Sequence, residues 1–225
     1  MTNIMQRQLL LWLGTALSLS ACGNDPKAAN DGNFEKALNA HYAVMKQCIR
    51  IGSEPNDEGI IQEYRSSAQT PGGNKEKEIL FYNGLVDLGL LEAVTYQRDE
   101  RGFSGQVKGK ADWVGYKFSE KGKSYLRPAN LDKGVFSTGT PQLCYGARQV
   151  VEITNFTEPA EVMGVKASTV QYTYKIVEVE PWAKEPIFSS RYDWLPKRLS
   201  DQNIEADDDL VLTNNGWVHH STFKQ

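Results

Sequence analysis

Two stretches in the N-terminal half carry apolar residues every three to four positions, the period of an amphipathic helix. The first covers residues 34–49, and the second runs from about 75 to 88. Gly89 follows the second stretch, where a glycine commonly ends a helix. His41 lies on the apolar face of the first stretch, so we expect a core histidine there. Gly, Pro, Ser and Asn are frequent between the two helices and predict loops, with a short turn around Ile60, Ile61 and Tyr64.

The C-terminal half instead alternates apolar and polar residues, which is the period of a strand with one buried face. Residues 143–156 predict one strand or two short ones, and residues 167–180 give the clearest alternation of the chain. The phase of that alternation slips between Ile176 and Val177, which predicts a bulge or a strong bend. Residues 186–200 then predict a loop.

The first residues of the chain have a different character. Arg7 is the only charged residue before Cys22, and an apolar core extends from Leu9 to Leu19. A membrane-spanning helix needs roughly 20 consecutive apolar residues, so this core is too short for one. Its length and flanks are typical of a secretory signal peptide, which predicts that residues 1–21 are removed. An uncleaved anchor or a buried N-terminal helix is the alternative.

The signal ends in Leu19-Ser20-Ala21-Cys22, which resembles the lipobox of bacterial lipoproteins. The resemblance implies cleavage before Cys22 and lipidation of its sulfur and new amine, and two or more acyl chains give stable anchoring. Gly23 stands where an Asp commonly retains such proteins in the inner membrane. The resemblance therefore implies the periplasmic face of the outer membrane. The small, polar residues 22–32 predict a flexible tether.

Three cysteines occur in the chain. With Cys22 lipidated, Cys48 and Cys144 remain as a pair in an oxidising compartment, which favours a disulfide between them. Two buried free thiols are the alternative. A catalytic cysteine needs a base nearby, and neither neighbourhood supplies one.

Residues 85–126 carry a second resemblance. Leu85-Val86-Asp87-Leu88-Gly89-Leu90-Leu91 ends the second helix, and Tyr116-Lys117-Phe118-Ser119-Glu120-Lys121-Gly122-Lys123-Ser124-Tyr125-Leu126 closes the polar stretch that follows. The pattern resembles winged-helix domains, in which the second motif follows a hairpin. Together with the alternation downstream, it predicts an α+β fold: a winged-helix-like helical and hairpin subdomain at 33–128, packed on a mostly antiparallel β subdomain at 129–225.

Basic residues outnumber acidic ones in the expected hairpin, and Arg98, Arg101, Lys108 and Lys110 are its candidate binding residues. The whole chain has 25 Lys and Arg against 28 Asp and Glu. This ordinary balance, in an exported protein, excludes nucleic acid as the partner. The basic residues indicate attraction to an anionic surface or an acidic protein; a solvated hairpin is the alternative.

Two tryptophans, Trp182 and Trp194, flank a loop rich in Pro and Tyr. Exposed indoles there would stack on the sugar rings of peptidoglycan or fill a pocket in a partner protein. Packing in the core under the loop is the alternative interpretation.

Leu210–Thr213 and Trp217–His220, separated by Asn-Asn-Gly, predict a hairpin at the end of the chain. This hairpin brings the acidic run Asp207-Asp208-Asp209 near His219-His220, a combination that holds divalent cations in some proteins. Adjacent residues of a strand point to opposite faces, however, so few of these groups converge. A solvated acidic turn is the favoured interpretation, and we expect no metal and no cofactor.

The usual nucleophile, metalloprotease and phosphate-binding motifs do not occur in the sequence. The sequence therefore predicts a non-enzymatic cell-envelope lipoprotein that binds or scaffolds an envelope protein or peptidoglycan. A hydrolase acting on envelope material is the alternative. A redox or metal protein is a third possibility, which requires a reducible cysteine pair or a metal at the Asp/His cluster.

Overall fold

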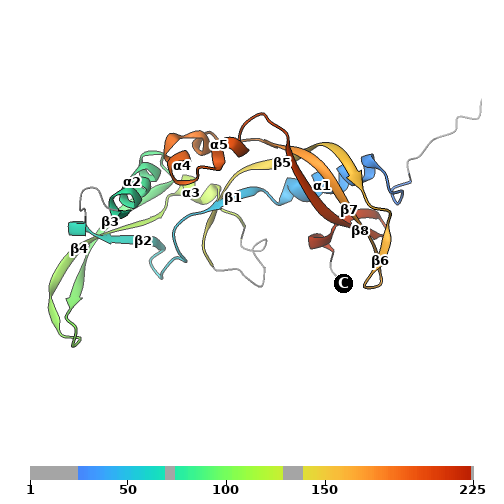
Figure 1. Ribbon diagram of the computed structural model, residues 1–225. Coiled ribbons are helices and arrows are strands. Elements are labelled where there is room, and N and C mark those ends of the chain that lie inside the picture. Colours follow the sequence, from blue (N-terminus) through green and yellow to red (C-terminus); the bar gives the residue numbers. More distant parts are fainter. Residues whose placement is uncertain (1–24, 69–73, 129–138, 224–225) are drawn as a thin grey trace, which may run out of the picture.

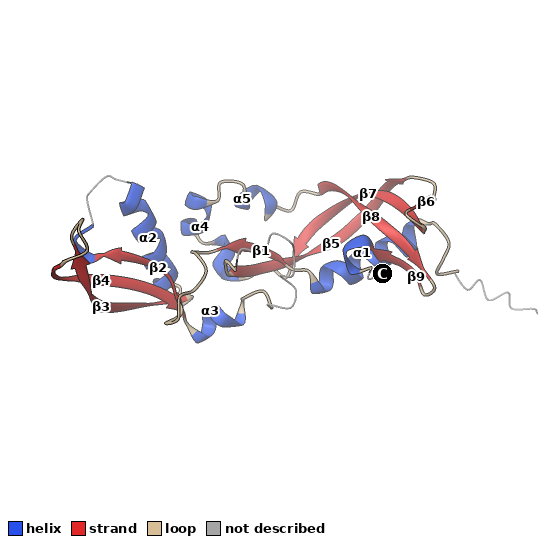
Figure 2. Cartoon of the chain, turned by 90° about the horizontal axis from the view of Figure 1, so that it is seen from below, coloured by secondary structure: helices blue, strands red, loops and turns tan. Residues whose placement is uncertain are grey.

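The computed structural model describes residues 25–68, 74–128 and 139–223, which form an elongated molecule with two antiparallel sheets (Figure 1). The larger sheet and the smaller one lie toward opposite ends of the long axis in both views (Figures 1 and 2). Among the described residues, no helix is both long enough and apolar enough to cross a membrane.

The larger sheet has the strand order β1-β5-β7-β8-β9, with β6 added beside β7. Its strands are β1 (Gln47–Arg50), β5 (Gln142–Phe156), β6 (Ala160–Val162), β7 (Val165–Val177), β8 (Ile204–Thr213) and β9 (Gly216–His219). Helix α1 (Asp31–Val44) packs on β5 and β9. Phe34 and Leu38 of the helix are fully buried against the sheet, and together with Trp217 they form one apolar core.

The smaller sheet has the order β2-β4-β3, formed by β2 (Ile60–Arg65), β3 (Leu91–Arg101) and β4 (Val107–Phe118). Helix α2 (Asn74–Asp87) packs on β3 and on α4. The remaining helical segments are short: η1 (Ser66–Ala68), α3 (Glu120–Ser124), η3 (Pro181–Lys184), α4 (Pro186–Arg191), α5 (Leu195–Arg198) and η4 (His220–Thr222). A second apolar core, which includes Ile61, Tyr82, Leu85 and Phe188, lies beneath these elements.

The expected α+β fold with a winged-helix-like half is wrong, because the molecule is mostly β. Strand residues make up 43% and helical residues 28% of the part of the chain that the structure describes. The two expected helices do not share a helical core: α1 packs on the larger sheet, whereas α2 covers the smaller one at the other end of the molecule (Figure 2).

Three local predictions also differ from the structure. The first helix ends at Val44 rather than at residue 49, and Cys48 lies on β1, which pairs with β5. The expected turn at Ile60 is strand β2, and the expected loop 186–200 holds the short helices α4 and α5. Pairing with distant strands and burial stabilise these segments. The spacing of apolar residues along a short stretch of sequence indicates neither of them.

The change of phase in the apolar and polar alternation near Ile176 coincides with the end of a strand rather than with a bulge. Strand β7 ends at Val177, and Glu178 directly after it has a φ of 52°, a left-handed conformation that turns the chain away from the sheet. The register shifts lie in the facing strand β5, between Val150 and Glu152 and again between Ile153 and Asn155. The chain therefore bends where the side-chain phase changes.

Residues 25–32, the described part of the predicted tether, lie against the larger sheet. Trp217 Nε1 donates to the carbonyls of Lys27 and Ala28, at 3.2 Å each. Asn30 caps α1 by accepting from the backbone N–H of Asn33. The rest of the predicted tether, and the predicted signal peptide with Cys22, lie outside the described residues.

Candidate binding surface

The β3–β4 hairpin continues beyond the smaller sheet as a free two-stranded ribbon. Strand β2 pairs with β4 only from Trp113 to Lys117, whereas β3 pairs with β4 as far as Val107. Residues 107–110 of β4 are exposed on both faces. Figure 1 shows the ribbon projecting away from the rest of the molecule.

Ion pairs neutralise the base of this ribbon. Arg98 Nη1 lies 2.5 Å from Glu63 Oε1, and its guanidinium stands over the Trp113 ring at 5.3 Å. Glu63 also accepts a hydrogen bond from the Tyr96 hydroxyl, and this bond, with the contact from Arg98, lowers the pKa of the Glu63 carboxyl. Arg98 is therefore tied to the sheet and is not a free charge.

The tip of the ribbon combines an exposed aromatic ring with exposed cations. Phe103 is fully exposed, and Val107 is exposed as well. Arg101, Lys108 and Lys110, on the two strands of the ribbon, are also exposed. Lys110 stands opposite Asp99 in the strand register, so the positive charge nearest to Phe103 comes from Arg101 and Lys108. Phe103 at the hairpin tip therefore contributes no buried packing to the fold.

Sequence reasoning identified the basic residues of the hairpin but not Phe103. The turn glycines around it, Gly102 and Gly105, were the available signal, since a phenylalanine inside a tight turn has no apolar partners along the chain.

The two predicted indoles lie in different surroundings. Trp182 is 4% exposed and packs against Phe188 and Tyr125 in the core, so its ring does not reach the surface. Trp194 is 42% exposed, with Tyr192 at its edge and Arg198 over its ring. Of the two, only Trp194 offers a face to a partner.

The acidic run 207–209 lies on strand β8 rather than in a turn, and its side chains alternate between faces. Asp207 and Asp209 are exposed, whereas Asp208 points toward α1. The Asp208 carboxylate accepts hydrogen bonds from Tyr42 (2.6 Å) and Tyr172 (2.5 Å), and lies 3.2 Å from His219 Nε2. The favoured interpretation as a solvated acidic turn is therefore wrong for Asp208.

The His219 imidazole connects this carboxylate to the end of the chain. Its Nδ1 lies 2.8 Å from Ser221 Oγ and also accepts the backbone N–H of Ser221 at 3.2 Å, which caps η4. Both ring nitrogens thus have partners, one in Asp208 and one in the turn that follows. This arrangement fixes the turn that follows β9.

Arg148 of β5 lies on the same cluster. Its Nη1 donates to the hydroxyls of Tyr42 (3.0 Å) and Tyr172 (3.3 Å). Burial opposes ionisation of Asp208, but the hydrogen bonds from His219, Tyr172 and Tyr42 together bring the pKa of its carboxyl below the ordinary value. Burial also raises the pKa of the Tyr42 hydroxyl to about 12. The cluster is a polar network between α1 and the sheet, in which Arg148 Nε is buried without a hydrogen-bond partner.

No group of three or more His, Cys, Asp or Glu side chains in the described ranges is arranged to hold a metal ion. Cys48 and Cys144 form a disulfide with the sulfurs 2.06 Å apart, which confirms the expected pairing. The bond joins directly opposite residues of β1 and β5.

No protein-family model matches the chain, and comparison with curated proteins and with solved structures gives no match either.

Proposed function

We propose that the protein is a lipid-anchored, non-enzymatic binding protein of the cell envelope, and that the tip of the β3–β4 ribbon contacts its partner. The observation that carries this proposal is Phe103, fully exposed at the end of a ribbon that no other strand covers. Arg101 and Lys108 beside it favour an acidic surface with an apolar pocket for the ring. A partner protein combines those two features, so it is the proposed class of partner.

Export is supported by chemistry at two separate places in the chain. The lipobox-like residues Leu19-Ser20-Ala21-Cys22 favour lipidation at Cys22, and the Cys48–Cys144 disulfide is of a kind that persists in oxidising compartments. Gly23 favours the outer membrane, with the body facing the periplasm.

The shape of the molecule fits a protein that reaches from its anchor to a partner. Residues 25–30 lie against the larger sheet, whereas the ribbon projects from the other end (Figure 1). A lipid at Cys22 would attach close to the first of these ends. The ribbon tip would then stand away from the membrane that holds the anchor.

The test is site-specific photocrosslinking in intact cells. A photoreactive amino acid replaces Phe103, and the matched control carries it at Met163, an equally exposed apolar residue on the β6–β7 turn (93% exposed). We expect a discrete crosslinked protein from position 103 and none from position 163. Equal crosslinking from both positions, or none from either, overturns the assignment of the ribbon.

The anchor is tested separately with Cys22→Ala. We expect the wild type to incorporate a radiolabelled fatty acid and to fractionate with the outer membrane, and the variant to do neither. If the position-103 crosslink also weakens in Cys22→Ala cells, anchoring and binding are linked. A wild type that incorporates no label contradicts the lipoprotein assignment and leaves the ribbon result unaffected.

A further inference from the structure

The β6–β7 turn exposes apolar side chains at one end of the larger sheet. Val162 is 53% exposed and Met163 is 93% exposed, and residues 162–165 carry no charge. The flanking residues Glu161 and Lys166 stand opposite each other in the strand register, so their charges offset one another. The tip of this hairpin is therefore an uncharged, apolar surface.

The backbone of the turn makes methionine an unusual residue for this position. Met163 has a φ of 52° and Gly164 a φ of 80°, both in the left-handed region. A two-residue hairpin loop with two positive φ angles favours Asn-Gly or Asp-Gly, because a longer side chain is strained there. The neighbouring β8–β9 turn carries the polar pair Asn214-Asn215. Met163 gains no burial in return for this strain, so folding does not account for a methionine here.

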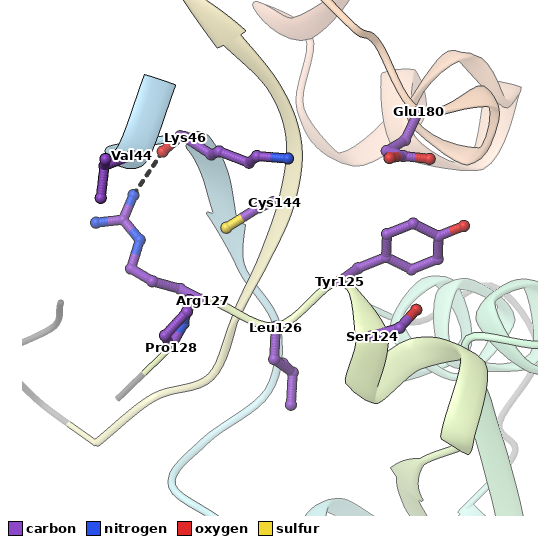
Figure 3. A pocket seen from close by; sticks show the side chains of 9 residues that line it. All are labelled: Val44, Lys46, Ser124, Tyr125, Leu126, Arg127, Pro128, Cys144 and Glu180. Atoms are coloured by element: carbon purple, nitrogen blue, oxygen red, sulfur yellow. Dashed lines mark hydrogen bonds between the residues drawn. The ribbon is translucent and has the colours of Figure 1, made fainter. Parts of the chain in front are cut away.

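The apolar surface continues from the turn into a groove of about 580 Å³. Five apolar side chains share its lining: Val162, Met163, Val165, Val211 and Phe223. Asp209 and His220 also line it. A groove of about 400 Å³ beside the disulfide has Lys46, Arg127 and Glu180 in its lining (Figure 3). Of the two grooves, the one at the β6–β7 turn is the more apolar.

This turn lies at the end of the sheet where the described chain begins. Strand β7 starts at Val165, two residues before Ala167, and β8 ends at Thr213, two residues after the partner of Ala167. Thr213 pairs with Gly216, and a Cβ built on Gly216 would meet the Pro26 carbonyl oxygen at 2.8 Å. Strands β6, β7, β8 and β9 are successive neighbours, so β6 lies roughly 14 Å from β9. Figures 1 and 2 show β6 and the start of α1 at the same end of the molecule.

The proposed lipid attachment site is within reach of the same edge. Cys22 precedes Pro26 by four residues, which span at most about 14 Å when fully extended. A bilayer that holds a lipid at Cys22 therefore comes close to the apolar turn.

On the basis of the lipidation of Cys22 proposed above, we propose that the β6–β7 turn inserts Val162 and Met163 into the bilayer that holds the anchor. Apolar side chains bind at the boundary between headgroups and acyl chains through the apolar area that they bury. A lipid on a short peptide does not by itself fix the orientation of the body, whereas two contacts along one edge of the sheet do. The ribbon at the opposite end is then held away from the bilayer. A turn buried in lipid yields no crosslinked protein, so position 163 keeps its use as a control for the ribbon.

The experiment reconstitutes the lipidated mature protein into vesicles of phosphatidylethanolamine and phosphatidylglycerol that carry a nitroxide on their acyl chains. A nitrobenzoxadiazole fluorophore is attached to Met163→Cys, Asn215→Cys or Phe103→Cys. The disulfide and the lipid occupy the native cysteines, so the new cysteine is the one that reacts. We expect quenching at position 163 to exceed that at position 215 by at least about 2-fold, and position 103 to stay unquenched.

Asn215→Cys is the matched control, because its turn lies at the same edge of the sheet and reports closeness to the anchor alone. Equal quenching at positions 163 and 215, or no quenching at position 163, overturns the proposal. Flotation of the vesicles separates the two assignments. Protein that floats without quenching at position 163 keeps the anchor and contradicts only the insertion, whereas protein that does not float contradicts the lipidation and the insertion together.

A second set of variants keeps the native turn residue, since the first fluorophore replaces Met163. The fluorophore is attached to Lys166→Cys in the same hairpin, with Met163 kept or changed to Asn. Asparagine tolerates the left-handed conformation, so Met163→Asn preserves the turn. We expect Met163→Asn to lower the quenching at position 166 about 2-fold. Unchanged quenching would show that Met163 does not hold the turn in the bilayer.

Discussion

The imidazole of His41 lies flat on that of His219, with ring centroids 3.7 Å apart and ring planes 7° from parallel. His41 belongs to α1 and His219 to β9, so this contact joins the first helix to the last strand. Burial, and then the neighbouring His219, bring the pKa of His41 down from 6.5 to about 4. His41 is therefore neutral at physiological pH, and its protonation would place a buried charge against the sheet.

The first prediction is a loss of stability in mild acid. The unfolded chain protonates His41 near pH 6.5, whereas the folded protein does so only near pH 4. The stability contributed by neutral His41 is therefore complete above pH 6.5 and is lost as the pH falls toward 4. We expect the free energy of unfolding, measured in urea, to drop by on the order of 2 kcal/mol across that window.

His41→Gln should flatten that pH dependence, because glutamine does not titrate. The other groups facing His41 are Asp208, which favours the charged form, and His219, His220 and Arg148, which oppose it. His220→Gln removes an exposed imidazole that only adds to the effect of burial and His219, so it should leave most of the slope in place. If the free energy of unfolding of His41→Gln still falls between pH 6.5 and 4, the acid sensitivity belongs to another group.

The second prediction concerns Asp208, which accepts hydrogen bonds from two tyrosines and lies beside His219. Asp208→Ala removes the carboxylate that accepts from both hydroxyls and that lies beside His219. We expect a loss of about 2–3 kcal/mol in urea unfolding. Asp207→Ala, one residue away on the exposed face, should stay within about 0.5 kcal/mol of the wild type. Similar losses for both variants would mean that the network does not stabilise the fold.

Local patterns in the sequence predict several elements of this structure but neither its mostly β fold nor its long-range pairings. The helix after residue 74, the alternation in β7 and the final hairpin depend on periods and turn residues, and they occur where those signals lie. Strand β1 was missed because Gln47–Arg50 continues the helical period of α1, and only its pairing with β5 makes it a strand. That pairing joins residues 96 positions apart, a separation that no local window covers.

Contacts between distant parts of the chain also limit what the sequence predicts about the disulfide, the polar network and the exposed ribbon. The disulfide was predictable because few cysteines were available and their compartment was inferred. The polar network was not, because Tyr42, Tyr172 and Asp208 come from three separate elements that meet only in the fold. Phe103 was missed for the opposite reason: its proposed role follows from its exposure, which a sequence pattern does not reveal.

The third prediction concerns Gly122, in the short helix α3. A Cβ built on Gly122 would lie 1.9 Å from the carbonyl oxygen of Leu90, at the start of the smaller sheet. That atom is backbone and cannot rotate away, so Gly122→Ala must displace α3. We expect a loss of about 2–4 kcal/mol in the free energy of unfolding.

Gly32→Ala is the matched control for Gly122→Ala. Gly32 lies in the first turn of α1, where the nearest atom to a new Cβ is Asn30 Oδ1 at 3.7 Å. Alanine also favours a helix by up to about 1 kcal/mol over glycine. Gly32→Ala should therefore be neutral or slightly stabilising. If Gly122→Ala is equally well tolerated, α3 does not pack on the sheet as closely as the structure indicates.

The fourth prediction is the contribution of the disulfide to stability. Cys48–Cys144 closes a loop of 96 residues and thereby restricts the unfolded chain. Replacing both cysteines by serine should lower the free energy of unfolding by about 2–5 kcal/mol. Strand β1 has only four residues and lies at the edge of its sheet, so it depends on this bond more than its neighbours do. Hydrogen exchange should accordingly show the largest loss of protection at residues 47–50, while α2 on the other sheet retains its protection. A uniform loss of protection across both sheets would instead indicate that the bond acts only through the unfolded state.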